Sequence, residues 1–421
     1  MKDHICNPQE KTIPSAPVHS RVKKWRDRTY WTILFLIAGL LLSTSVAMAR
    51  KAPPGGKLFR REDVSWLDQE CIRQLRACRV TAEDGTILYT PDGHSPYKAL
   101  WTRDFSFMVE NAGDLIPQSQ IRDAILYLLK GQREDGCVPD HVQPNGQVFY
   151  VAGNSGAPME DAPTDNSQFM VKLVADYIRI SGDPKFFNIV STQLDRAMNF
   201  TPRSAGGLVH IPPGRRQSAF GYTNRIAESG DLLFPSLLYW EACRLIAHLH
   251  EKAGRLEKSA EYRYRAKLIE RNLDTLFTDE AGLYFAASAD CRQIDIWGSA
   301  YSVYLNFPTS HLERIRQSLL TQLLRYSWKG QIRHLLKGEY WQGFLTDVRK
   351  DTFQNGAYWG MASGWIIAAL APVDPAKASA LFSELIKYYR KNGIPQCAGP
   401  GYFETPDFVL SAVNVRAVAR R

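Results

Sequence analysis

Hydrophobic side chains recur at intervals of three and four residues through most of the chain, which is the spacing of one face of an α-helix. Strict alternation of apolar and polar residues occurs only near 80–89 and 147–151, where short strands are expected. With Pro, Gly, Asp and Ser taken as start and stop signals, the pattern predicts an all-α chain of twelve helices. Their expected ranges are 63–78, 105–115, 118–131, 166–181, 184–200, 231–253, 255–276, 297–306, 310–326, 355–370, 375–391 and 409–419.

Short and long connections alternate between these helices. The short ones contain a proline, as in Ser181-Gly182-Asp183-Pro184, and predict tight turns between paired helices. The long ones are rich in Gly, Pro, aromatic and acidic residues and span 132–165, 201–230, 277–296, 327–354 and 392–408. In a ring of helical hairpins this alternation puts every long connection on one face, where functional residues are expected.

The N-terminus has the pattern of a targeting segment. Five Lys or Arg lie between Arg21 and Arg28, followed by an apolar run from Ile33 to Leu42 and the small-residue sequence Ala47-Met48-Ala49. The apolar run suits a signal peptide better than a membrane span, whereas the long polar leader before it also suits a signal anchor. We therefore expect a signal peptide or signal anchor at 1–49, a flexible spacer at 50–62 and one folded domain at 63–421.

Both alternatives export the body of the protein, which would then be periplasmic, extracellular or membrane-anchored and facing outward. Membrane contact is expected only through an uncleaved N-terminal segment.

Residues 1–49 contain seven Lys or Arg against three Asp or Glu, so the net charge of +9 falls to +5 for the remainder. This small charge, without a basic stripe, argues against a nucleic-acid partner. Six cysteines follow the leader without a CxxC spacing, which leaves disulfides and buried thiols equally open.

Several segments, in this order along the chain, resemble the six-hairpin glycosidase superfamily of glucoamylases, trehalases and processing glucosidases. They are Leu100-Trp101-Thr102-Arg103-Asp104-Phe105, which is similar to a W-x-R-D motif; Asp165-Asn166 at a helix start; Ile294-Asp295-Ile296-Trp297-Gly298; and Gln354-Asn355-Gly356-Ala357-Tyr358-Trp359-Gly360. The resemblance covers roughly residues 60–420. It implies an (α/α)₆ toroid and an exo-acting, inverting glycoside hydrolase that acts on an oligosaccharide or glycoconjugate. No cofactor and no metal are expected, because the familiar motifs for them are missing from the sequence.

Arg103 and Asp104, with Trp101 beside them, are the first candidates for substrate binding. A carboxylate accepts from two sugar hydroxyls, and an adjacent guanidinium orients it with planar donors. The alternative is a helix cap with an ion pair, since Asp104 begins an apolar helix.

The general acid is expected in the segment from Gly221 to Asp231. Some relatives have an Asp where this chain has Asn224, and an amide cannot protonate a leaving group. The acid role would then fall to Glu228 or Asp231, of which Asp231 has the alternative role of capping the next helix.

The base is expected at Glu404, which lies between aromatic residues in the last long connection, with a solvated surface carboxylate as the alternative. The remaining substrate-binding candidates are carboxylates, amides and aromatic rings of the long connections: Asp165, Asn166, Trp297, Glu339, Trp341, Gln354, Asn355 and Trp359. Glu339 is also a rival of Glu404 for the base. Any single aromatic is more often core than a sugar platform.

Other chemistries find less support in the sequence. No G-x-G-x-x-G, P-loop, G-x-S-x-G or H-E-x-x-H motif occurs. Two alternatives to hydrolysis stay open: a glycan-binding protein without catalysis, to which Asn224 points, and a toroidal polysaccharide lyase or sugar epimerase. The oligomeric state and the identity of the sugar are not specified by any motif.

Overall fold

The computed structural model describes residues 58–93, 97–152 and 161–420. The expected targeting segment and residues 50–57 of the expected spacer lie outside these residues. The chain divides into two units, and the second, Pro53–Arg421, contains every element described below. In the described residues, none of the helices combines the length and apolarity that a membrane crossing requires.

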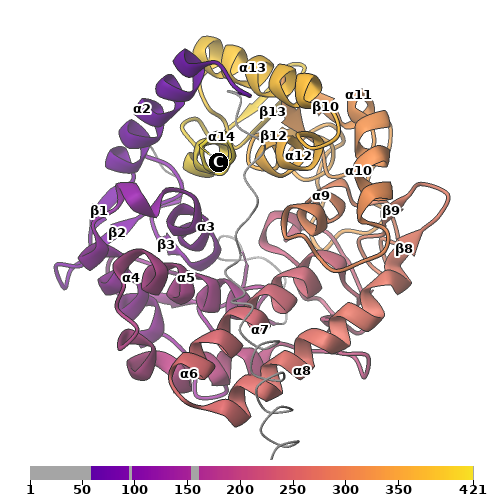
Figure 1. Ribbon diagram of the computed structural model, residues 1–421. Helices are drawn as coiled ribbons and strands as arrows, with labels where there is room; N and C mark the ends of the chain where they lie inside the picture. Colours follow the sequence, from indigo (N-terminus) through magenta and orange to yellow (C-terminus); the bar gives the residue numbers. More distant parts are fainter. Residues whose placement is uncertain (1–57, 94–96, 153–160, 421) are drawn as a thin grey trace, which may run out of the picture. The chain divides into compact units, whose positions relative to one another are not determined.

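Six helices of this unit form an inner ring (Figure 1). Each contacts the next one in the ring, and the last contacts the first, so the ring is closed. The inner helices are α3 (Thr102–Ala112), α5 (Asn166–Ser181), α7 (Leu233–Lys252), α9 (Ile296–Tyr304), α12 (Ser363–Leu370) and α14 (Val409–Ala419).

Six further helices alternate with these along the chain and pack outside them. They are α2 (Arg61–Ala77), α4 (Gln118–Lys130), α6 (Phe186–Phe200), α8 (Leu256–Asn272), α10 (Leu312–Thr321) and α13 (Pro375–Asn392). The short helix α11 (Leu323–Tyr326) follows α10. Burial separates the two layers: ten of the eleven residues of α3 are buried, whereas α2 buries a single stripe at helical spacing.

Each inner helix before α14 leads into a short connection, and each outer helix leads into a long one. All long connections therefore meet the amino ends of the inner helices, where backbone N–H groups are unpaired and the helix dipole is positive. The long connections contain short antiparallel strands, which fix their backbones. The two-stranded sheets are β1 (Arg79–Thr81) with β2 (Ile87–Tyr89), β6 (His210–Ile211) with β7 (Gly230–Asp231), and β8 (Phe277–Thr278) with β9 (Leu283–Tyr284).

Two larger sheets join segments that are distant in the sequence. One contains β3 (Leu100–Trp101), β4 (His141–Val142) and β5 (Val148–Phe149). The other contains β10 (Ser327–Trp328), β11 (Gln331–Ile332), β12 (Tyr358–Trp359), β13 (Cys397–Gly399) and β14 (Tyr402–Glu404). These sheets bring the candidates near residues 101, 359 and 404 onto the long-connection face.

The predicted helices are confirmed with two corrections. The helix expected at 355–370 begins only at Ser363, because 358–359 is a strand and Gly356 has a φ of +122°, which a helix cannot accommodate. The helix expected at 310–326 is interrupted at Gln322, which separates α10 from α11. The six described cysteines are buried and free, so the thiol alternative holds for them.

A buried ion pair fixes the inner ring from within. Lys172 on α5 donates to Glu241 on α7 at 2.6 Å, and both side chains are buried. Tyr301 on α9 donates to the same Glu241 oxygen at 2.8 Å. Because a buried charge without partners is costly, these contacts tie three consecutive inner helices in one relative position.

Candidate active site

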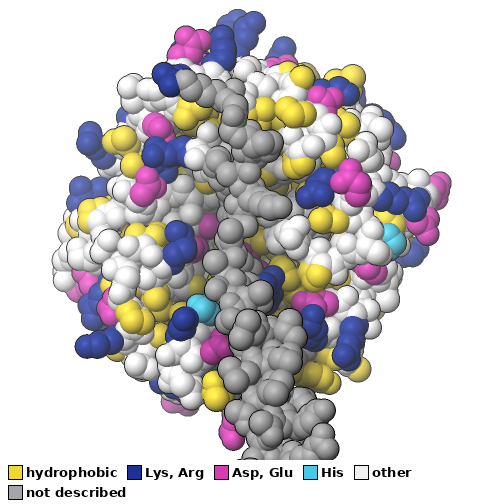
Figure 2. Space-filling model, viewed as in Figure 1, with side chains coloured by type: hydrophobic (Ala, Val, Ile, Leu, Met, Phe, Trp, Pro, Cys, Tyr) yellow, Lys and Arg dark blue, Asp and Glu magenta, His cyan; other side chains and the backbone are white. Residues whose placement is uncertain are grey.

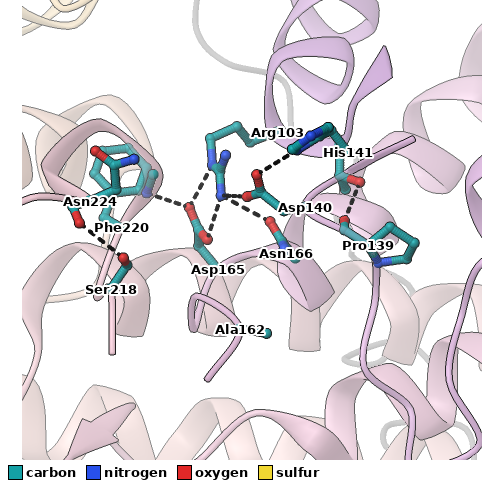
Figure 3. Close-up of polar contacts among 12 residues, drawn as sticks. Arg103, Pro139, Asp140, His141, Ala162, Asp165, Asn166, Ser218, Phe220 and Asn224 are labelled. Carbon is teal, nitrogen blue, oxygen red and sulfur yellow. Dashed lines mark hydrogen bonds and ion pairs between the residues drawn. The ribbon is translucent and has the colours of Figure 1, made fainter. Parts of the chain in front are cut away.

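Arg103, in the first turn of α3, is the centre of a buried ionic network (Figure 3). Its Nη2 donates to Asp140 at 2.6 Å, and its Nε donates to Asp165 at 3.1 Å. Nη2 also donates to the Asn166 side-chain oxygen at 3.1 Å. Asp165 in turn accepts the backbone N–H of Gly221 at 2.9 Å. The guanidinium thus joins the starts of α3 and α5 to the loops after α4 and α6.

The neighbouring Asp104 does not share this network. Its Oδ1 accepts a 2.8 Å hydrogen bond from the hydroxyl of Tyr222, and its side chain is almost fully buried. Burial raises the pKa of Asp104 to about 7, against the opposing effects of Arg103 and the Tyr222 hydroxyl. Neither Arg103 nor Asp104 therefore acts as the surface ion pair or simple helix cap that the sequence left open.

Trp101 is the first of three stacked rings beside this network. The indole packs on His141 with ring centroids 4.0 Å apart, and His141 packs on Phe149 at 4.7 Å. Asp140 binds the Nδ1 atom of His141 at 3.1 Å with the carboxylate oxygen that does not take Arg103. One carboxylate therefore orients both a guanidinium and an imidazole.

Glu228 is the candidate whose surroundings best suit a general acid. It lies in the loop before α7, and its side chain is 5% exposed. Burial raises the pKa of Glu228 to about 8; the Thr223 hydroxyl opposes the shift and the carboxylate of Asp295 adds to it. A carboxyl group with this pKa is protonated at neutral pH and can donate.

Asp295 was noted in the sequence only as part of a motif. It is the N-cap of α9, and its Oδ1 accepts the backbone N–H of Trp297 at 2.9 Å. Burial raises the pKa of Asp295 to about 7 despite the backbone N–H groups of Gly298 and Trp297. Asp295, at the start of α9, therefore lies within electrostatic reach of Glu228 in the loop before α7.

The other residues of the predicted acid segment have structural partners. Asp231 binds the Nδ1 atom of His210 at 2.9 Å in the β6–β7 ribbon. Asn224 accepts from the Gln354 amide at 2.8 Å, and its backbone oxygen accepts from Ser218 at 3.0 Å (Figure 3). Asn224 thus holds two loops together, which accounts for an amide at this position.

Glu404 is half-buried on β14, where its Oε2 accepts from the hydroxyl of Tyr402 at 2.9 Å. Tyr97 lies within electrostatic reach of both Glu404 and Asp104, because both carboxylates contribute to the raised pKa of its hydroxyl, after the larger effect of burial. Tyr97 also donates to Gln396 at 3.2 Å. The structure thus brings Glu404 to the same face as Arg103 and Asp104.

The candidates from the 339–359 connection lie mainly in its interior. The indole N–H groups of Trp341 and Trp359 donate to the backbone oxygens of Gln354 and Phe353, and Asn355 binds the backbone of Trp341 and Val348. Both Trp rings are buried, so they support the connection rather than offer an open face.

Glu339 is half-buried, and its backbone oxygen accepts a hydrogen bond from Arg333 at 2.9 Å.

Within the described residues, no group of three or more His, Cys, Asp or Glu is arranged to hold a metal ion. Figure 2 shows positive and negative side chains interspersed on the described surface of this view.

Sequence reasoning did not select Asp140, His141, Tyr222, Asp295 or His334 as site residues. All five lie in long connections that were expected to carry function, and Asp295 also stands in one of the motifs. The sequence did not show which of these residues contact Arg103 and Asp104, because the contacting residues are 37 to 118 positions away along the chain.

We predict that Gly221→Ala damages the site. A Cβ atom at Gly221 would lie 1.8 Å from Arg103 Nε, and Arg103 cannot move aside because Asp140 and Asp165 hold it. Such overpacking costs about 1–3 kcal/mol of unfolding free energy. Gly206→Ala is the matched control, since its Cβ meets only ordinary contacts at 3.6 Å. Denaturant unfolding of both variants measures the difference, and equal stabilities would contradict the prediction.

No protein-family model and no curated protein sequence matches the chain. Among solved structures, a rhamnosidase from Klebsiella oxytoca with rhamnose bound is similar over 88% of this chain and 66% of its own, slightly less than two thirds, with a TM-score of 0.63 and 14% identity. A GH63 mannosylglycerate hydrolase from Thermus thermophilus, in complex with Tris and D-glycerate, is similar over 83% of this chain and 99% of its own, with a TM-score of 0.59 and 14% identity.

The similarity to these two structures extends over 88% and 83% of this chain. At 14% identity it establishes the architecture rather than an activity. The chain therefore has the (α/α)₆ toroid fold that the rhamnosidase and the mannosylglycerate hydrolase share, and the fold predicted from the sequence is confirmed.

Proposed function

We propose that the protein is a glycoside hydrolase. The observation that carries the proposal is Glu228, a buried carboxyl group with a pKa of about 8 beside Asp295 on the face of the long connections. Glycoside hydrolysis needs a carboxyl group that stays protonated until it transfers its proton to the leaving oxygen. The structural neighbours named as hydrolases add support at the level of fold.

In this proposal Glu228 protonates the glycosidic oxygen and Glu404 activates the attacking water. Arg103 and its carboxylate partners position Asp104, which accepts hydrogen bonds from the hydroxyls of the terminal sugar. Acid and base come from loops on different sides of the ring, which suits an inverting enzyme with a water molecule between them. Recognition of a terminal sugar by a buried carboxylate suits exo-action.

The proposed substrate is an oligosaccharide or glycoconjugate. Neighbours of the same fold are named for rhamnose and for mannosylglycerate, so both 6-deoxyhexosides and mannosides belong in a substrate screen. The targeting pattern at 1–49 supports an exported protein that meets its substrate outside the cytoplasm.

The test is a screen of 4-nitrophenyl α- and β-glycosides of hexoses, 6-deoxyhexoses and pentoses. We expect release of nitrophenol from one sugar and anomer, and proton NMR of the first product should show the inverted anomer. A retained anomer would exclude inversion. Sugar binding by calorimetry without cleavage of any glycoside would favour a glycan-binding protein, and an unsaturated product absorbing in the ultraviolet would favour a lyase.

A further inference from the structure

The rings of Trp297 and His334 form a buried stack at the start of α9, close in sequence to Asp295. Their centroids are 3.7 Å apart and their planes are inclined by 25°. The backbone holds the pair together, because the N–H of Ile296 donates to the backbone oxygen of His334 at 2.9 Å. Trp359 packs edge-on against both rings. The orientation of the stack is therefore fixed before any ligand binds.

The polar edges of this stack have no protein partner. Neither Nε1 of Trp297 nor Nε2 of His334 makes a hydrogen bond within the described residues, and both atoms are buried. The neighbouring indoles of Trp341 and Trp359 differ, because their N–H groups donate to backbone oxygens. Each unsatisfied buried group costs about 1–3 kcal/mol, so a polar group that pairs with both atoms of the stack would be bound favourably.

His334 is an acceptor at its unpaired nitrogen. Burial lowers the pKa of His334 to about 3, with a further contribution from Arg333, so the ring is neutral at physiological pH. Its hydrogen bond to the backbone of Tyr222 raises the pKa, which means that the ring donates to the carbonyl oxygen. Since Nε2 is unpaired, the donor is Nδ1–H, and Nε2 carries a lone pair. Trp297 Nε1 offers a donor.

The position of the stack connects it to the proposed chemistry. Tyr222 binds Asp104 through its hydroxyl and His334 through its backbone. Trp297 follows Asp295 by two residues and donates its backbone N–H to that carboxylate. The stack therefore adjoins Tyr222, which binds the carboxylate proposed to grip the sugar, and Asp295, which lies within electrostatic reach of the proposed acid.

We propose that His334 and Trp297 together recognise one hydroxyl group of the substrate sugar. The hydroxyl donates to His334 Nε2 and accepts from Trp297 Nε1, so a single group satisfies both atoms. A sugar that lacks this hydroxyl leaves both unpaired, which makes the pair a specificity determinant. This inference rests on the proposed function and assigns a role to His334, which no sequence motif suggested.

The test measures binding rather than turnover and uses the full chain with Glu228→Gln, so that no substrate is consumed. Calorimetry with methyl α- and β-glycosides of mannose, glucose, galactose and rhamnose identifies the sugar that binds best, and its monodeoxy analogues are then compared. We expect one analogue to bind about 10–100-fold more weakly than the parent sugar. Adding His334→Phe should reduce this discrimination to less than about threefold, because the acceptor is lost while a stacked ring remains.

His334→Gln is the matched control, because its amide oxygen can replace the Nε2 acceptor; we expect it to restore discrimination at the same position. Trp297→Phe removes the donor alone and repeats the test if His334→Phe does not fold, as judged by thermal unfolding. If all variants discriminate equally between the parent sugar and its deoxy analogue, the proposal is overturned. Trp297 Nε1 and His334 Nε2 would then bind a structural water. Failure to bind any sugar would overturn it as well. If the parent protein binds a sugar but cleaves no glycoside, only the proposed hydrolase function is overturned.

Discussion

Glu228→Gln is expected to lower turnover of a disaccharide substrate by about 10²–10⁴-fold, which is the usual contribution of general acid–base catalysis. The amide keeps the size and polarity of the side chain but has no proton to transfer. The loss should be much smaller with a 2,4-dinitrophenyl glycoside, because its leaving group departs as a stable phenolate without protonation. Comparing kcat/KM on the two substrates separates an acid from a base.

The same variant should become more stable than the parent as pH rises. The pKa of Glu228 is about 4.5 in an unfolded chain and about 8 in the fold, so between these values the folded state holds a proton that the unfolded state has released. Stability of the parent therefore falls with rising pH across this window, and Glu228→Gln lacks that decline. Thermal unfolding of both proteins from pH 5 to 9 measures this effect. The Tm of the variant relative to that of the parent should rise as the pH increases.

Asp231→Asn is the comparison for Glu228→Gln, since the sequence left both carboxylates open as the acid. Asp231 is bound to His210 in the β6–β7 ribbon, so Asp231→Asn should retain most turnover. Its loss of kcat/KM relative to the parent should be the same for the disaccharide and for the 2,4-dinitrophenyl glycoside. The opposite outcome, an active Glu228→Gln and an inactive Asp231→Asn, would transfer the acid role to Asp231.

The ring could be predicted because its cause is local. Helical spacing and the prolines of the short connections are visible within one or two helices, and the alternation of connection lengths follows from where these helices end. The predicted start at 355 failed because strand pairing decides there: Trp359 pairs with Ile332 and Cys397, which are distant in sequence. Short strands that depend on remote partners leave little periodic signal.

The candidate site could be predicted only in part. Arg103 and Asp104 were found because their segment resembles a W-x-R-D motif. The division of their roles arises from Asp140, Asp165 and Tyr222, which fold in from other connections. The raised pKa of Glu228 depends on burial, which no single-residue pattern reports. The interpretation of Asn224 as a lost or relocated acid changes once its bond to Gln354 is known.

Arg103→Met is expected to be the most destabilising single change in the site. Asp140 and Asp165 are fully buried and would lose the guanidinium that binds both of them. Removing one partner from a buried ion pair costs about 3–5 kcal/mol, because the remaining charges stay desolvated. We also expect sugar binding to be abolished, since the start of α3 would no longer hold Asp104 against Tyr222.

Arg416→Met is the matched control for this prediction. Arg416 is as buried as Arg103 and also binds two carboxylates, Asp68 and Asp114, but their side chains are 27% and 57% exposed. Water can solvate these carboxylates when the cation is lost, so the control should lose less stability and should keep sugar binding. Urea unfolding and calorimetry on both variants provide the measurements. If the two substitutions cost the same free energy, or if Arg103→Met binds sugar as tightly as the parent, then the Arg103 network is only structural.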